Sequence, residues 1–135
     1  MPLIRIDVIE GQHSNADLAE VSAAVHRGIV EVFGVPERDQ FQIVTEHRPG
    51  RLVYNNSYLG IERTDKIVMV QVFFSTGRTD DQKKTFYALV ARTIAERTKT
   101  RSEDVMIALI ENTRSDWSFG NGVAQYLMLP KEQWK

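Results

Sequence analysis

Apolar and polar residues follow a clear pattern in the first third of the chain. Residues 3–9 are mostly apolar with charged interruptions, which predicts a strand close to the first residue. Apolar residues then recur at helical spacing over residues 18–33, and either Ser14 or Asn15 is a suitable N-cap. Gly34 ends this helix. Residues 41–45 predict a second, short strand.

The same order of elements returns in the second half of the chain. Residues 67–74 are apolar, β-branched or aromatic, which predicts a buried strand. Residues 79–82 match a capping box, and the apolar positions of residues 86–94 predict the helix that follows. Residues 105–110 predict another strand.

Two further segments lack a long periodic pattern. Residues 51–66 predict a polar connection with a short strand at 52–54. Residues 116–129 are rich in glycine and aromatic residues and predict a loop with a short strand.

The order strand, helix, strand occurs twice, with pseudo-repeats at about 2–50 and 67–112 of a single domain spanning 1–135. Asp39 and Asp104 each precede a strand and lie 65 positions apart. Parallel strands need a crossover helix, and right-handed crossovers place both helices on one face of the sheet. We therefore predict an α+β fold, with duplicated β-α-β units forming a four-stranded mixed sheet. The other face needs a cover, and identical subunits in a ring would provide it.

Composition narrows the range of functions. The chain has 135 residues, 42% of them hydrophobic, a net charge of −1 and no cysteine. Its Lys and Arg residues are dispersed along the chain, so its charge does not indicate binding to nucleic acid or to an anionic membrane surface. Lack of cysteine excludes thiol chemistry and disulfides. No membrane span or signal-peptide pattern is present, and we expect a cytoplasmic protein.

Pro2 is the first candidate for chemistry. Removal of Met1 would make it an N-terminal secondary amine at the start of a strand. An α-amino group titrates near pH 8, and apolar surroundings or a nearby cation favour its neutral form. Such an amine can act as a general acid or base, or add to a carbonyl carbon. The alternative is that Pro2 has no role in chemistry and is one of the small residues that commonly follow the first methionine.

Arg78 and Asp39 are charged residues in loops at strand ends. Arg78 follows the second buried strand, where a guanidinium can bind a substrate carboxylate through two hydrogen bonds. Asp39 precedes the second strand and can orient a water molecule or hold a protonated amine. The alternatives are a solvated arginine and a structural aspartate in a turn.

The segment 116–122 supplies two aromatic residues, Trp117 and Phe119, which can wall a small apolar pocket. Their alternative role is to cover the core or a subunit contact. The three histidines lack metal-ligand spacing, and we expect no metal and no organic cofactor. A glycine-rich phosphate loop and a serine nucleophile motif are also absent from the sequence.

Taken together, these residues resemble the tautomerase superfamily, specifically its malonate semialdehyde decarboxylase group. The similarity runs along nearly the whole chain, and its last motif is the most specific. The matching stretches are Pro2-Leu3-Ile4, Ile9-Glu10-Gly11, Val32-Phe33-Gly34-Val35-Pro36 with Asp39, Val44-Thr45-Glu46-His47-Arg48-Pro49-Gly50, Asp81-Gln82-Lys83 with Phe86-Tyr87, Glu103-Asp104-Val105-Met106 through Glu111-Asn112, and Asp116-Trp117-Ser118-Phe119-Gly120.

The resemblance implies the duplicated β-α-β fold, a homotrimer and catalysis by the N-terminal proline on a small oxo acid. It implies catalytic roles for Pro2, Asp39 and Arg78, with Arg78 also binding substrate. Trp117 and Phe119 correspond to pocket residues, and Thr76 is a further candidate for substrate binding. No cofactor is implied.

One departure concerns the substrate-binding loop. The decarboxylases carry Arg-Pro-Arg there, whereas this sequence has Thr76-Gly77-Arg78. Thr76 thus removes one cation from beside the proline and weakens the expected hold on a carboxylate. Decarboxylase, keto-enol tautomerase and hydratase therefore all stay open as activities, and a non-catalytic trimeric module is the alternative of another class.

Overall fold

The computed structural model describes residues 2–135, so Met1 and the question of its removal lie outside the described residues. Four strands form one sheet in the order β2-β1-β3-β4: β1 (Leu3–Ile9), β2 (Phe41–His47), β3 (Val68–Ser75) and β4 (Val105–Asn112). The pairs β1–β2 and β3–β4 are parallel, while β1 and β3 run antiparallel. The predicted mixed four-stranded sheet is confirmed.

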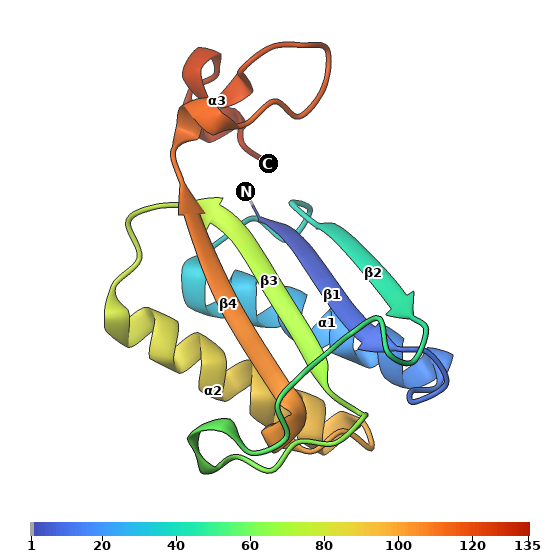
Figure 1. Ribbon diagram of the computed structural model, residues 1–135. Helices are drawn as coiled ribbons and strands as arrows, with labels where there is room; N and C mark the ends of the chain where they lie inside the picture. Colours follow the sequence, from blue (N-terminus) through green and yellow to red (C-terminus); the bar gives the residue numbers. More distant parts are fainter. Residues whose placement is uncertain (1) are drawn as a thin grey trace.

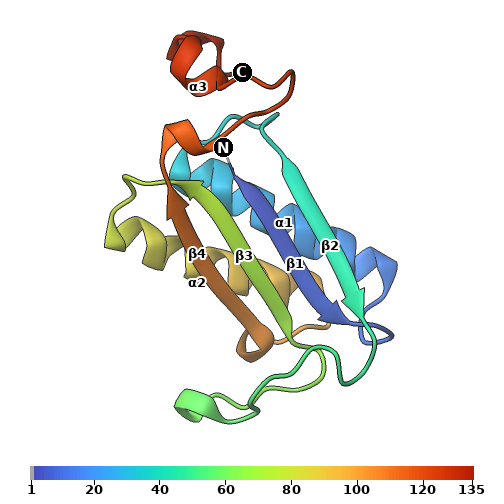
Figure 2. The same cartoon turned by 45° about the horizontal axis from the view of Figure 1, so that its top comes forward.

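Two long helices cover one face of this sheet (Figures 1 and 2). They are α1 (Asn15–Phe33), capped by Ser14, and α2 (Asp80–Arg97), which begins with the predicted capping box. The helices approach closely at Gly28, where an added Cβ would lie 2.8 Å from Val90 Cγ2. α1 and α2 begin 65 residues apart, the same offset that separates Asp39 from Asp104.

The hydrophobic core lies between the sheet and these helices. Every second residue of β1 and β3 faces it, because side chains alternate along a strand. The largest fully buried side chains are Phe86, Ile4, Ile6, Ile29, Ile67, Ile94, Val8, Val21, Val25, Val68, Val70 and Val72.

The opposite face of the sheet is only partly apolar. Phe41, Ile43 and Met106 are 45–49% exposed there. Between them lies a polar pair, in which His47 Nε2 is 2.6 Å from Asp7 Oδ1. Water-exposed side chains of this size are consistent with the expectation of a subunit contact on this face.

Both predicted short strands are wrong. Residues 51–66 contain only a 3₁₀ turn, Tyr58–Gly60. Just after positions 52–54, Arg63 Nη1 donates to the carbonyls of Asn55, Tyr58 and Ile61, so a side chain holds this turn together.

The tail contains helical turns instead of a strand: 3₁₀ turns at Arg114–Asp116 and Lys131–Gln133, and the short helix α3 (Gln125–Met128). The Gln125 side chain accepts from Phe119 N and donates to the Gly120 carbonyl, which folds the loop back on itself. None of the helices in residues 2–135 combines the length and hydropathy that crossing a bilayer requires.

The topology brings distant parts of the sequence to one edge of the sheet. Because β1 and β3 are antiparallel, the amino ends of β1 and β2 lie beside the carboxyl ends of β3 and β4. The tail folds over this same edge, close to the N-terminus (Figure 1). Candidate residues from all four strand ends therefore gather there.

Candidate active site

Pro2 is buried and directly precedes β1, an inner strand of the sheet. The next residue, Leu3, pairs with Phe41 on β2 and with Phe73 on β3, so strands flank the proline position on both sides. Asp39 lies two residues before Phe41, which places it close to the start of β1. Pro2 and Asp39 thus lie at the same end of the paired strands β1 and β2.

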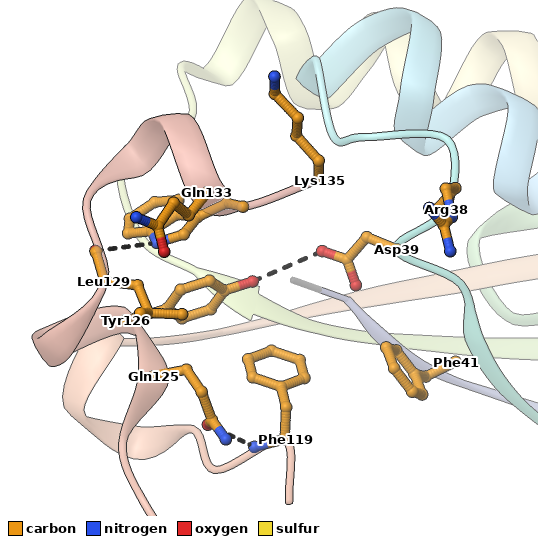
Figure 3. Close-up of a pocket in the computed structure, with 10 residues that line it drawn as sticks. Arg38, Asp39, Phe41, Phe119, Gln125, Tyr126, Leu129, Gln133 and Lys135 are labelled. Atoms are coloured by element: carbon orange, nitrogen blue, oxygen red, sulfur yellow. Dashed lines mark hydrogen bonds between the residues drawn. The ribbon is translucent and has the colours of Figure 1, made fainter.

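Asp39 lines a cavity of about 260 Å³ between the sheet edge and the tail (Figure 3). A turn holds it in place, because its backbone N–H donates to the Pro36 carbonyl at 3.0 Å. Its carboxylate Oδ2 accepts a hydrogen bond from the Tyr126 hydroxyl at 3.5 Å. The cavity is lined by Arg38, Asp39, Phe41, Phe119, Gln125, Tyr126, Leu129, Gln133, Trp134 and Lys135.

Stacked aromatic rings form one wall of this cavity. Phe119 lies at its centre: its ring is 5.6 Å from Trp117 in a parallel stack, 4.9 Å from Tyr126 edge-on and 5.9 Å from Phe41. The Trp134 ring lies 4.5 Å from Tyr126 on the other side. Trp117 therefore supports the wall from behind, while Phe119 contacts the cavity directly. Such an aromatic wall suits a small substrate.

Arg78 lies in the loop between β3 and α2, outside the lining of the Asp39 cavity. Its Nη2 donates to the Phe33 carbonyl at 3.2 Å, and its guanidinium carbon lies 5.7 Å from the centre of the Phe33 ring. Its buried Nε makes no hydrogen bond within residues 2–135. One end of the guanidinium is therefore anchored to the last residue of α1, while its buried Nε–H is not used within the described residues.

Thr76 begins the same loop and contacts Glu111 rather than the cavity. Its hydroxyl donates to Glu111 Oε2 at 2.5 Å, and its backbone N–H donates to the Asn112 carbonyl at 2.8 Å. Lys83 on α2 also donates to the Glu111 carboxylate. The hydrogen bond from Lys83, followed by that from Thr76, holds the pKa of Glu111 below its usual value. The position that an arginine occupies in the decarboxylase loop is here tied to a carboxylate.

Of the predicted residues, Asp39 and Phe119 line the same cavity, and Trp117 packs behind Phe119. Pro2 and the Thr76–Arg78 loop belong to neighbouring strand ends and are not part of that lining. Tyr126 was missed by sequence reasoning, because α3 is too short to show a periodic pattern. Burial raises the pKa of Tyr126 to about 12. Within residues 2–135, no three acidic or histidine side chains gather closely enough to hold a metal ion.

Comparison with known protein families supports the resemblance seen in the sequence. Two family models, both described as tautomerase enzyme, match residues 39–120 and 2–60. The chain belongs to the tautomerase superfamily. It is 37% identical to the probable tautomerase YrdN of Bacillus subtilis (strain 168), over 94% of this chain and 97% of that protein. The probable tautomerase YusQ of the same strain is 36% identical over a similar span.

Solved structures place the protein close to the malonate semialdehyde decarboxylases within this superfamily. One such enzyme, with decarboxylase and hydratase activities, is 35% identical, covers 93% of this chain and 95% of its own, and superposes with a TM-score of 0.85. Another, inhibited by 3-bromopropiolate, is 37% identical, covers 95% and 99%, and gives a TM-score of 0.86. The protein is therefore a tautomerase-superfamily enzyme of the isomerase or lyase type.

Proposed function

We propose that this enzyme uses Pro2, freed by removal of Met1, to act on a small oxo acid, with decarboxylation of malonate semialdehyde as its leading reaction. The observation that carries the proposal is the burial of Pro2 directly before β1, at the same end of the sheet as the Asp39 cavity. An amine in such surroundings favours its neutral form more than one in water. Similarity to two malonate semialdehyde decarboxylases supports the choice of substrate.

In this proposal Arg78 binds the substrate carboxylate and Pro2 acts on the carbonyl. The bond between the carboxylate carbon and its neighbour breaks, and its electron pair moves toward a carbonyl protonated by Pro2 or toward an iminium nitrogen formed with it. The enol or enamine then takes a proton at carbon. Carbon dioxide and acetaldehyde leave, after hydrolysis by water where an iminium was formed. Asp39 holds the amine or positions that water.

A second candidate is a keto-enol tautomerase or a hydratase of related acids. The hydrogen bond between Thr76 and Glu111 favours this second candidate. Thr76 stands where the decarboxylase loop has its first arginine, so this chain lacks that cation. A tautomerase needs Pro2 only to move a proton between carbon and oxygen, so it depends less on tight binding of the carboxylate.

Proton NMR of malonate semialdehyde with enzyme whose intact mass confirms loss of Met1 tests the proposal. We expect acetaldehyde to form with the wild type and with Pro49→Ala, which changes a proline in an exposed turn. Pro2→Ala should lose most turnover, since a primary amine differs in basicity and conformational freedom.

Equal rates for wild type and Pro2→Ala would contradict a role for the proline. A lack of acetaldehyde, followed by turnover of phenylenolpyruvate or hydration of a propynoate that requires Pro2, would establish the second candidate instead.

A further inference from the structure

The cavity in which the proposed acid substrate has to bind already contains a carboxylate. Asp39 belongs to its lining, together with the rings of Phe41 and Phe119. An acid substrate brings a second negative charge into the same space of about 260 Å³. Two like charges repel each other more where apolar side chains, rather than water, surround them. The acid therefore needs a cation of the lining to bind close to Asp39.

The loop after β3 does not supply this cation to the lining. Arg78 lies outside it, with Nη2 donating to the Phe33 carbonyl at 3.2 Å and the guanidinium carbon 5.7 Å from the centre of the Phe33 ring. Thr76 carries no charge, and its hydroxyl donates to Glu111. Within the cavity, the charge of Asp39 is thus not balanced from this loop.

Two cations do belong to the described lining, Arg38 and Lys135 (Figure 3). Arg38 directly precedes Asp39 in the segment between α1 and β2. Its side chain is exposed and makes no hydrogen bond or ion pair with any other of residues 2–135. All five N–H groups of its guanidinium are therefore available to a ligand. Lys135 can offer only a point charge from the exposed tail.

The backbone that carries Arg38 is held in place on both sides. The Asp39 N–H donates to the Pro36 carbonyl at 3.0 Å, which closes a turn around Arg38. On the other side, His26 of α1 binds the Glu37 carbonyl through Nε2 at 2.8 Å. A guanidinium on a fixed backbone, with no partner of its own, is suited to binding a carboxylate through two parallel hydrogen bonds.

We propose that Arg38 binds the carboxylate of the oxo acid in the Asp39 cavity and so takes the place of the loop arginine that Thr76 replaces. This contact forms in the ground state and persists in the transition state. Arg38 therefore sets the affinity for the acid more than the rate of the chemical step. The inference rests on the proposed function, because it concerns the acid on which Pro2 acts.

Arg38→Met removes the charge and keeps an unbranched apolar stem. Kinetics use whichever of malonate semialdehyde and phenylenolpyruvate the wild type converts. We expect KM to rise about 10-fold, as for loss of one charge-assisted hydrogen bond, while kcat and the melting temperature change little. Arg38→Lys keeps the charge without the planar fork, so its KM should lie between the two. Arg27→Met, a change on the exposed side of α1, is the matched control and should keep the KM of the wild type.

A second measurement does not depend on turnover. Malonate, an unreactive three-carbon acid, should bind the wild type and Arg27→Met equally in calorimetric titrations, and Arg38→Met about 10-fold more weakly. Malonamide, which has the same skeleton without charge, should not distinguish Arg38→Met from the wild type. Lys135→Met should weaken malonate binding less than Arg38→Met does. The reverse order would overturn the proposal and assign the carboxylate to the tail.

The failure of this inference can be told apart from failure of the proposed function. Unchanged KM and malonate affinity in Arg38→Met, beside an inactive Pro2→Ala, would overturn the role of Arg38 and leave the proposed function intact. A lower kcat with unchanged malonate affinity, or no malonate binding by the wild type, would also overturn it. If Pro2→Ala were as active as the wild type, the proposed function itself would fail.

Discussion

Two aspartates at corresponding positions have different surroundings. Asp39 precedes β2 and lines the cavity, whereas Asp104 precedes β4 and is 1% exposed. Asp104 accepts from Thr64 N at 2.6 Å and from Thr64 Oγ1 at 2.7 Å, and Arg101 lies 3.6 Å away. The sequence pattern alone treats the two residues alike, since both stand before a strand. Their neighbours assign one to the site and the other to the connection that crosses the end of the sheet.

This contrast predicts that an Asp→Asn substitution lowers stability at one position and catalytic rate at the other. Asp104→Asn weakens charge-assisted bonds in a buried position and should lower the free energy of unfolding by roughly 1–3 kcal/mol, with kcat unchanged. Asp39→Asn should lower kcat and leave that free energy nearly unchanged. Urea unfolding and steady-state kinetics on both variants check the prediction. Loss of stability in Asp39→Asn with normal turnover would assign Asp39 to the turn that precedes β2.

At the scale of elements, Glu111 connects three pieces of structure. It lies in β4 and receives hydrogen bonds from Thr76, in the loop after β3, and from Lys83, in the first turn of α2. The loop that carries Arg78 is thereby tied to both of its neighbours. Because these bonds lower the pKa of Glu111 in the folded state, the unfolded chain binds more protons in the acid range.

We therefore expect Glu111 to contribute stability that depends on pH. Its contribution is complete above the unfolded pKa of 4.5 and is lost as the pH falls through the lower folded value. The melting temperature of the wild type should exceed that of Glu111→Gln at pH 6, and the gap should close toward pH 3. Glu96→Gln, an exposed change on α2, serves as the control. A gap of constant size would mean that the carboxylate charge is not what stabilises this junction.

Periodicity predicted the long elements well because burial of one face dictates where apolar residues stand. Residues 3–9 form β1 as expected, and Ser14, Gly34 and Thr79 cap their helices as their chemistry suggests. The two predicted short strands were wrong, and side chains hold the turns that form in these segments: Arg63 binds carbonyls just after positions 52–54, and Gln125 binds the backbone of the tail loop. Such contacts depend on the folded tail and connection and leave no pattern in the sequence.

At the scale of the whole molecule, one face of the sheet is left without a covering layer. Both helices lie on the opposite face, and no described segment fully covers Phe41, Ile43 or Met106. A single chain buries a limited share of its surface at this size, so association is an effective way to remove these side chains from water. We propose that three copies meet through this face, as the resemblance to the tautomerases implies.

The assembly can be tested with one substitution on β2. Light scattering should give three times the 15.5 kDa of one chain for the wild type and for Arg27→Glu, a change on the exposed side of α1. Ile43→Lys should give a smaller species, because burying an unpaired ammonium is costly. Lysine is a better test than glutamate at this position, because a glutamate would pair with Arg5, the register partner of Ile43. A trimer that survives Ile43→Lys would place the subunit contact on another surface. A monomeric wild type would mean that this face is stable in water with its Asp7–His47 pair exposed.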